Sequence, residues 1–396
     1  MTKSLFKRSG NYFLGLILSK ALNLFLFIYV AKLLVPQDFG SIIYYSTIVA
    51  LATLIADFGT IQWYQKQISL FTNKTKVIHN LINARLFTFI ISAILIGLYL
   101  LVSQRFSLFL SALLLLTLIP EALLSIFDGY YLEKKQPAKI SIKQISRSVI
   151  LAIFVLVFYQ NLTIEIFAFA LFASAITNIF WFVPWKYCKT FVFNIKKALK
   201  TLKQSSQYAV LITTSYAYSR GDSLIIENTI GSASLGIYSA AYRYLEGLSL
   251  LPTALAQNLF HIAAKKDTLK VTQVYKITAA MLVLGVLAGI GVFITAPFLT
   301  TTLLGSEYAL SETVLQVFAV VVVLFFVNAP LGSIVQSSDL LKKFIPFGIA
   351  NTAVNLALNI VYIPVYGVMA AAWIMLVTEL TGLLINTWFV RKIYTK

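Results

Sequence analysis

Five charged residues lie close together within apolar sequence. Two apolar segments between Ser219 and Gln257 meet at a short turn of small residues and contain Arg220, Asp222, Glu227, Arg243 and Glu246. Arginine suits contacts with phosphate groups, and a carboxylate in apolar surroundings suits the binding of a proton or a cation. A charge at the centre of a bilayer costs roughly 2.5 to 3.5 kcal/mol on insertion scales, so a chain that keeps five is expected to use some of them. The stretch predicts a charged path through the interior of a membrane protein.

The composition supports a membrane protein. Of the 396 residues, 59% are hydrophobic and 12% are charged, with a mean hydropathy of +0.85, whereas soluble domains have about 25% charged residues. The formal net charge of +18 does not indicate nucleic-acid binding, because the basic residues form short clusters between apolar segments. The only cysteine is Cys188, and His79 and His261 each stand alone. We therefore expect neither an intrachain disulfide nor a metal site.

Apolar windows of about 20 residues, the length that crosses the hydrocarbon core, predict twelve helices and hence an all-α polytopic fold. They cover residues 11–34, 41–63, 78–102, 107–127, 142–160, 164–185, 206–229, 235–259, 274–299, 313–337, 344–363 and 368–390. The first window is too long for a signal peptide and is predicted to span the membrane. The longest polar stretch lies near the chain midpoint. It divides the sequence into an N-terminal six-helix bundle (1–190), a basic cytoplasmic linker (191–205) and a C-terminal six-helix bundle (206–396).

Lysine and arginine positions predict the orientation. With the N-terminus in the cytoplasm, 25 of the 32 basic residues fall in cytoplasmic segments, five fall within helices, and only Lys32 and Arg105 fall on the opposite side. Basic residues concentrate on the cytoplasmic side of membrane proteins. We therefore expect an even number of spanning helices, with both termini in the cytoplasm.

Two turns suggest an internal duplication. The segment from Leu34 to Gly40 has a counterpart from Ile230 to Gly236, and each places a glycine just before a helix, 196 residues apart. The alternative is that glycines simply mark turns. If the duplication is real, the halves have parallel topology, and transporters built in this way place the substrate site between the halves.

The five basic residues within predicted helices fall into two groups. Arg85 and Arg147 lie within about two turns of the cytoplasmic ends of their helices, so either side chain is able to reach the interface. Lys20, Arg220 and Arg243 lie nearer the middle of their helices, where the alternative to a binding role is a structural ion pair.

Amides and isolated acids mark further positions. Asn351, Asn355 and Asn359 recur at spacing four in the eleventh predicted helix. They form either a wall that faces sugar or water, or a helix-packing contact. Asp57 in the second helix and Glu379 in the twelfth are candidates for proton or sodium coupling.

Motifs of soluble enzymes are missing from the sequence. There is no P-loop, no GxGxxG that opens a helix, no HExxH and no GxSxG. No predicted loop is large enough to hold an active site. We therefore predict that the protein is not an enzyme and needs no cofactor beyond a coupling ion, H⁺ or Na⁺.

Five segments, in order along essentially the whole chain, resemble one known family. They are Leu33–Gly40, Ala56–Gly59, Gly236–Arg243 with Asp222 ahead of it, Leu304–Tyr308 and Asn355–Ala371. Together they resemble the Wzx-type O-antigen and polysaccharide flippases, the polysaccharide transporter family of the multidrug/oligosaccharidyl-lipid/polysaccharide exporter superfamily. The chain ends soon after its twelfth predicted helix, and no match to the fourteen-helix lipid II flippases is expected.

The resemblance implies two six-helix bundles around a central cavity that opens alternately to each side of the bacterial inner membrane. The implied substrate is an undecaprenyl-pyrophosphate-linked oligosaccharide, moved from the cytoplasmic to the periplasmic leaflet. Partners would be membrane lipids, the polysaccharide polymerase and the chain-length machinery. The implied substrate-binding residues are Lys20, Arg85, Arg147, Arg220, Arg243, Asn355 and Asn359. In the family, acids that face the cavity are linked to ion antiport, and that role would fall to Asp57, Asp222, Glu227 or Glu379.

Three other functions are considered. A drug or cation antiporter of the same superfamily typically has acidic and aromatic sites. The five cations within predicted helices argue against this function. A membrane polysaccharide polymerase commonly carries a large outer loop, whereas the longest predicted loop here is cytoplasmic. A non-transporting assembly subunit would use the buried charges only for helix packing.

Overall fold

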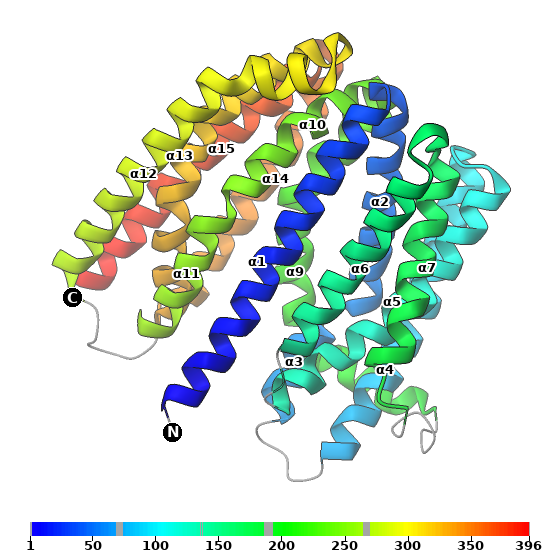
Figure 1. Ribbon diagram of the computed structural model, residues 1–396. Coiled ribbons are helices and arrows are strands. Elements are labelled where there is room, and N and C mark those ends of the chain that lie inside the picture. Colours follow the sequence, from blue (N-terminus) through cyan, green and yellow to red (C-terminus); the bar gives the residue numbers. More distant parts are fainter. Residues whose placement is uncertain are drawn as a thin grey trace. The chain divides into compact units, whose positions relative to one another are not determined.

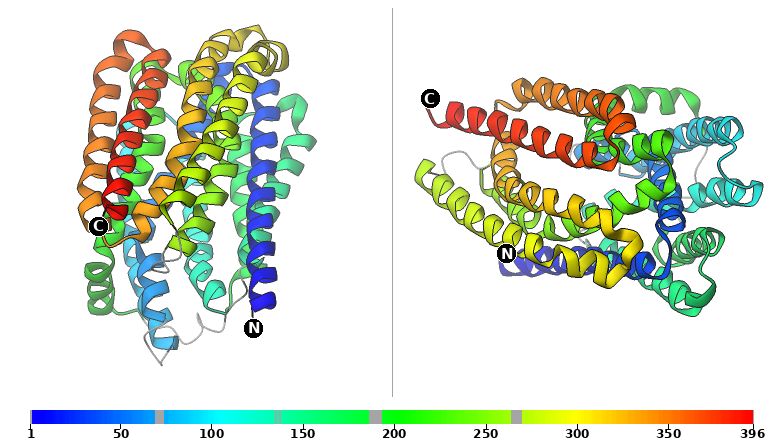
Figure 2. Two further views of the ribbon diagram at one scale, coloured as in Figure 1. Left: turned by 90° about the vertical axis from the view of Figure 1, so that its left-hand side faces the viewer. Right: turned by 90° about the horizontal axis from the view of Figure 1, so that it is seen from above.

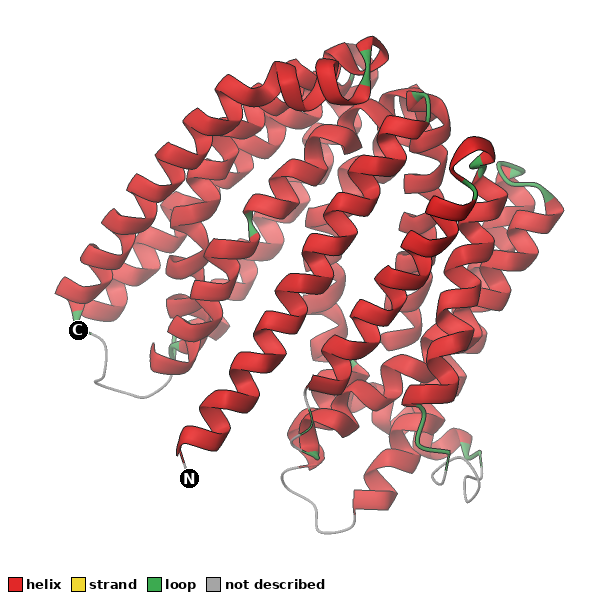
Figure 3. Cartoon of the chain, viewed as in Figure 1, coloured by secondary structure: helices red, strands yellow, loops and turns green. Residues whose placement is uncertain are grey.

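The structure is a computed structural model that describes residues 2–68, 74–134, 136, 138–185, 193–263 and 270–395. Every long element in this described part is a helix (Figures 1 and 3). The first seven are α1 (Thr2–Leu33), α2 (Pro36–Asp57), α3 (Thr60–Ile68), α4 (Lys74–Ser103), α5 (Leu108–Glu133), α6 (Ala138–Val157) and α7 (Ile164–Phe182). The others are α9 (Ile195–Ile230), α10 (Ser232–Leu248), α11 (Leu250–Ala263), α12 (Val271–Pro297), α13 (Ala309–Ser337), α14 (Leu341–Tyr366) and α15 (Val368–Tyr394).

Helices occur at all twelve predicted positions, and nine in the described part are long and apolar enough to cross a membrane. The other three positions correspond to α1, α9 and the pair α10 and α11. The predicted single helix over 235–259 is two helices, because α10 ends at Leu248 and α11 begins at Leu250. α9 is long enough, but its last three turns carry Arg220, Asp222 and Glu227. In α9 and at the break between α10 and α11, the departures from the apolar pattern therefore fall where the charges are concentrated.

The chain forms two compact units. The N unit consists of the chain up to Leu26 together with Tyr44–Tyr216, and the C unit consists of Phe27–Ile43 together with the chain from Ala217 onward. Three long helices, α1, α2 and α9, contribute to both units. Residues 195–205 of the predicted linker form the first turns of α9. The predicted domain boundaries remain a prediction.

Each unit has its own apolar core. In the N unit, Trp63 and Tyr64 of α3 pack with Leu81 of α4 and Phe127 of α5. In the C unit, α12, α13 and α15 lie side by side, with α14 against α15 (Figure 2). Many apolar side chains on the outside of these helices are exposed, as expected for surfaces that face lipid.

The start of α10, and its packing on α2, depend on three glycines. Gly231 has φ of 88°, a left-handed conformation that costs glycine little and ends α9 one residue before α10 begins. Gly236 packs so closely on α2 that a Cβ atom would overlap the carbonyl oxygen of Pro36. A Cβ atom on Gly40 would likewise overlap the carbonyl oxygen of Ser232. Helices α2 and α10 therefore approach closely only because Gly40 and Gly236 both lack a side chain.

Candidate functional site

Two arginines share one carboxylate in the C unit. Arg220 in α9 donates to Oε1 of Glu246, and Arg243 in α10 donates through Nη1 to Oε2 of Glu246 at 2.7 Å. Arg243 and Glu246 lie one turn apart on the same helix, which brings their side chains together. Two guanidinium groups thus contact the same carboxylate. We call Arg220, Arg243 and Glu246 the arginine cluster.

Aromatic rings hold both guanidinium groups of the arginine cluster. The guanidinium carbon of Arg220 lies 5.3 Å from the ring centroid of Tyr242, and that of Arg243 lies 4.1 Å from the ring centroid of Phe27. Such cation–π contacts contribute roughly 0.5 to 2 kcal/mol and use no hydrogen-bond donor. Within the described part, the buried Nε of Arg243 has no hydrogen-bond acceptor. The arginine cluster therefore keeps a donor available for a further acceptor, such as an anionic oxygen.

In the N unit, the predicted cations and acids are paired with each other. Arg85 in α4 is buried, contacts Asp57 at the end of α2, and donates from Nη1 to Oγ of Ser125 at 3.0 Å. Arg147 in α6 forms an ion pair with Glu121 in α5 at 2.6 Å. These contacts stabilise the packing of neighbouring helices, and their predicted roles in binding or coupling remain predictions.

Lys20 lies apart from these pairs. It is exposed on α1, in the portion of that helix that belongs to the N unit. The preceding residue, Ser19, contacts α6, because its Oγ lies 3.5 Å from Oγ of Ser148. The structure therefore gives Lys20 a solvent- or lipid-facing position and does not test its predicted role.

Asp222 and Glu227 are buried near the end of α9. The hydroxyl of Tyr238 in α10 donates to Asp222, whose other oxygen accepts from the backbone N–H of Ser223 at 2.6 Å. Glu227 accepts from Oγ of Ser232 at 2.8 Å. Both carboxylates thus help to fix α10 against α9, across the turn at Gly231.

Glu379 in α15 has a different set of partners. The hydroxyl of Tyr218 in α9 donates to Oε1 at 2.6 Å, and Nδ2 of Asn328 in α13 donates to Oε2 at 2.9 Å. The side chain is buried, with 6% of the residue exposed. None of its ion pairs or hydrogen bonds in the described part involves a basic residue. Glu379 is therefore a buried carboxylate whose partners are neutral.

The predicted asparagine stripe joins this carboxylate. Nδ2 of Asn355 donates to Oγ1 of Thr378 at 3.0 Å, and Nδ2 of Asn359 donates to Oδ1 of Asn355 at 3.0 Å. Thr378 also lies 3.5 Å from the hydroxyl of Tyr218. Within the described part, the buried Oδ1 of Asn359 accepts no hydrogen bond. The stripe therefore forms one polar network with Glu379, and the helix-packing and water-facing interpretations both apply to it.

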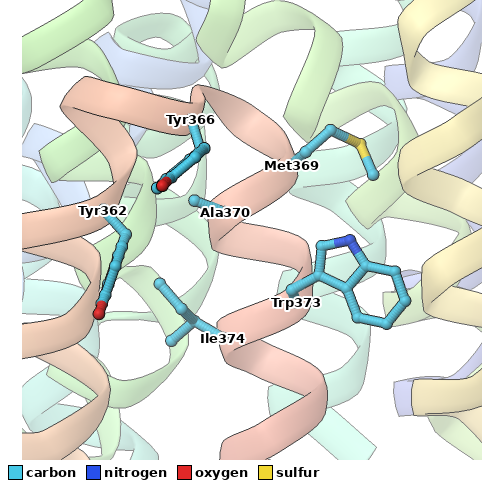
Figure 4. Close-up of a pocket in the computed structure, with 6 residues that line it drawn as sticks. All are labelled: Tyr362, Tyr366, Met369, Ala370, Trp373 and Ile374. Carbon is cyan, nitrogen blue, oxygen red and sulfur yellow. The ribbon is translucent and has the colours of Figure 1, made fainter.

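A cavity of about 400 Å³ lies where α14 and α15 meet (Figure 4). Its lining consists of Tyr362, Tyr366, Met369, Ala370, Trp373 and Ile374, none of which is charged. Tyrosine and tryptophan side chains are typical of the membrane–water interface. This cavity suits an apolar or aromatic contact and offers no charge for a phosphate group.

The sequence alone missed several partners of the predicted residues. Tyr218, Asn328 and Asn386 belong to the network around Glu379, and Tyr238 holds Asp222. Asn328 and Asn386 had a visible signal, because each is an amide within an apolar run. The two tyrosines had none, because tyrosine is common in this chain. In the described part, no group of three or more His, Cys, Asp or Glu side chains is arranged to hold a metal ion.

Comparison with known families decides the assignment of the chain. A family model described as "Polysaccharide biosynthesis protein" matches residues 5–260. The chain belongs to this family. No curated protein matches the sequence. The family match agrees with the resemblance to polysaccharide flippases and accounts for more than half of the chain, including the arginine cluster.

Solved structures with the same fold are membrane transporters. An inward-facing multidrug resistance MATE transporter matches with a TM-score of 0.71 and 12% identity, covering 97% of this polysaccharide biosynthesis protein and 99% of the transporter. The lipid II flippase MurJ, in an inward closed conformation, matches with a TM-score of 0.73 and 15% identity, covering 96% and 87% of the two chains. An outward-facing MATE transporter matches with a TM-score of 0.63 and 13% identity, covering 99% and 96%. At these identities, the likeness establishes the fold.

Two expectations are settled by these comparisons. The predicted all-α polytopic fold is confirmed by the apolar helices and by the transporters that share the fold. The expectation that lipid II flippases would not match is wrong for the fold, because the shared fold extends over 96% of this chain despite its shorter length.

Proposed function

We propose that this polysaccharide biosynthesis protein is a flippase for a lipid-linked oligosaccharide. In this proposal, both termini lie in the cytoplasm of a bacterium, and alternating access moves an undecaprenyl-pyrophosphate-linked glycan to the outer leaflet of the inner membrane. The exported unit would serve O-antigen or a related polysaccharide. The family match and the likeness to a lipid II flippase and to other transporters support this class of function.

The observation that carries the proposal is the arginine cluster. A pyrophosphate that enters a low-dielectric interior needs compensating cations, and arginine offers planar, paired donors to phosphate oxygens. Arg220 and Arg243 both contact the carboxylate of Glu246, and Nε of Arg243 has no acceptor in the described part. A pyrophosphate would compete with Glu246 for both guanidinium groups and supply the missing acceptor.

Glu379 is the proposed coupling residue. Of the four acids predicted for this role, Asp57 holds Arg85, and Asp222 and Glu227 fix α10 against α9. Glu379 contacts only neutral donors in the described part. Binding and release of H⁺ or Na⁺ at such a carboxylate changes its charge without breaking an ion pair. The protein would then act as an antiporter.

The test is the leaflet position of the lipid-linked oligosaccharide in cells that lack this gene. Spheroplasts are treated with a lectin or a glycosidase that does not cross the membrane. Completed units that stay inaccessible on the inner leaflet would support flipping. Single units that reach the outer leaflet but remain unpolymerised would instead identify a polymerase.

The drug or cation antiporter remains the second candidate, favoured by the likeness to MATE transporters. An unchanged pool of lipid-linked oligosaccharide, together with increased sensitivity to cationic drugs, would support it and overturn the flippase.

A further inference from the structure

We infer that the C unit contains a water-accessible proton path between Glu379 and the ends of α13 and α15 at Ser337 and Tyr394. The positive-inside pattern places those ends at the cytoplasm. This inference rests on the proposed function and deepens it, because it identifies the coupling ion as a proton and gives its route.

The proposed path is formed by facing rows of small and amide side chains. Along α13 and α15, which pack against each other, positions four residues apart lie on one face. The α13 row is Asn328, Gly332 and Gln336, and the α15 row is Thr378, Gly382 and Asn386. Nδ2 of Asn386 donates to Oδ1 of Asn328 at 3.2 Å, and Nδ2 of Asn328 donates to Glu379 at 2.9 Å. A continuous series of polar groups thus leads from Asn386 to the carboxylate.

The glycines leave room between these amides. A Cβ atom on Gly382 would lie 3.7 Å from Nδ2 of Asn328 and 4.0 Å from Nδ2 of Asn351. A Cβ atom on Gly332 would lie 3.7 Å from Nδ2 and 3.8 Å from Oδ1 of Asn386. Each glycine position therefore accommodates about one methyl group, and the nearest side-chain atoms are polar. A methyl group is similar in size to a water molecule, and water occupies buried space that offers it hydrogen-bond partners.

An unpartnered buried oxygen indicates where such a water binds. Asn386 is 8% exposed, and its Oδ1 accepts no hydrogen bond in the described part. Leaving a buried acceptor unpaired costs about 1 to 3 kcal/mol, so an ordered water is the expected partner. Beyond this point, a Cβ atom on Gly332 would lie 3.9 Å from Nε2 of Gln336, which is exposed one residue before α13 ends. The row therefore continues to the surface.

The groups around Glu379 suit a proton more than a metal cation. The packed elements present the phenol of Tyr218 from α9 and amides from α13 and α14, while Tyr242 of α10 donates to the Ser219 carbonyl near by. The basic residues on α14 and α15, Lys342, Lys343, Arg391 and Lys392, lie at the helix ends. An ionised carboxylate with only neutral partners is costly in an apolar interior. Proton binding removes that charge and needs one water-linked route rather than a shell of oxygen ligands.

The experiment measures proton uptake by the purified full-length protein in detergent, with a pH-sensitive dye, after a rapid drop in pH. Glu379→Gln should reduce the number of protons taken up. Gly382→Ala and Asn386→Leu should leave that number unchanged but slow the uptake by about tenfold, equivalent to a barrier raised by about 1.4 kcal/mol. Gly348→Ala on α14 is the matched control, because its methyl group would meet no described atom within 4 Å.

The outcomes separate the path from the proposed function. Unchanged uptake rates in both Gly382→Ala and Asn386→Leu, or an unchanged number of protons in Glu379→Gln, would overturn the path. Slower uptake in these variants, with normal movement of lipid-linked oligosaccharide between leaflets, would leave the path in place and overturn the coupled flippase. Thermal unfolding of each variant identifies any that fails to fold. If Asn386→Leu fails to fold, Asn386→Val, which is smaller and adds no titratable group, replaces it with the same slowed uptake expected.

Discussion

Replacing Arg243 with alanine tests the arginine cluster directly. The substitution removes the Nε that has no acceptor in the described part and the contact of 2.7 Å with Glu246. Glu246 keeps its contact with Arg220, so no carboxylate is left buried without a cation. Arg243→Ala should therefore fold. A hydrogen bond to a charged group contributes about 1.5 to 3 kcal/mol, so loss of one arginine–pyrophosphate contact should raise Kd by about tenfold to a hundredfold.

The assay is equilibrium binding of undecaprenyl pyrophosphate to the protein in lipid nanodiscs, with undecaprenyl phosphate as the second ligand. Arg243→Lys should give an intermediate Kd, because lysine keeps the charge but lacks the planar pair of donors. Glu246→Gln is the informative control. It removes the carboxylate that competes with pyrophosphate for Arg220 and Arg243, and we expect a lower Kd.

The two interpretations of the arginine cluster diverge at Glu246→Gln. If the three side chains form only a structural ion-pair network, Glu246→Gln and Arg243→Ala should lower the thermal stability alike and leave Kd unchanged. That result, or an unaltered Kd in the Arg220→Ala/Arg243→Ala double variant, would refute a role in pyrophosphate binding.

Three further predictions concern stability and topology. Arg85→Met should lower the free energy of unfolding by about 3 kcal/mol, because it leaves the half-buried Asp57 without its cation. The double variant with Asp57→Leu should recover most of the loss in denaturant titrations, and equal losses would argue against a stabilising pair. Gly236→Ala should cost about 1 to 3 kcal/mol through overlap with α2, while Gly291→Ala, whose methyl group meets no described atom within 4 Å, should not lower the melting temperature. A reporter active only in the periplasm and fused after Lys200 should be silent, and an active reporter would contradict the predicted topology.

The helices were largely predictable, whereas the breaks between them were not. Runs of about 20 apolar residues locate spanning helices because the thickness of the bilayer sets that length. The break at Ser249 lies between Gly247 and Pro252, and a window that averages hydropathy over this apolar run does not register either residue. The start of α9 at Ile195 was equally hidden, since the first turns of this helix are basic. Hydropathy averages over such features.

The positions of the charged residues within helices could be predicted from the sequence, but their interaction partners could not. Any acid or base within an apolar run is visible, so Arg85, Asp57 and Glu379 were all candidates. Which of them neutralise each other depends on how separate helices rotate and pack. Arg85 and Asp57 are 28 residues apart on different helices, and only the packing of α4 on α2 brings them together. The pair of Arg243 and Glu246 is the exception, because it is local to one helix.

The close approach of α2 and α10 has a consequence for the history of the chain. Gly40 lies on the carbonyl of Ser232, and Gly236 lies on the carbonyl of Pro36. Position 40 corresponds to 236 and position 36 to 232, each 196 residues further on, so the two contacts are reciprocal. Reciprocal contacts of this kind are what two identical subunits make across a two-fold axis. The turns therefore behave as the interface of a dimer whose subunits have been fused into one polypeptide. Neither turn is free to gain a side chain unless the backbone of the other moves, so relatives are expected to change both positions together or neither.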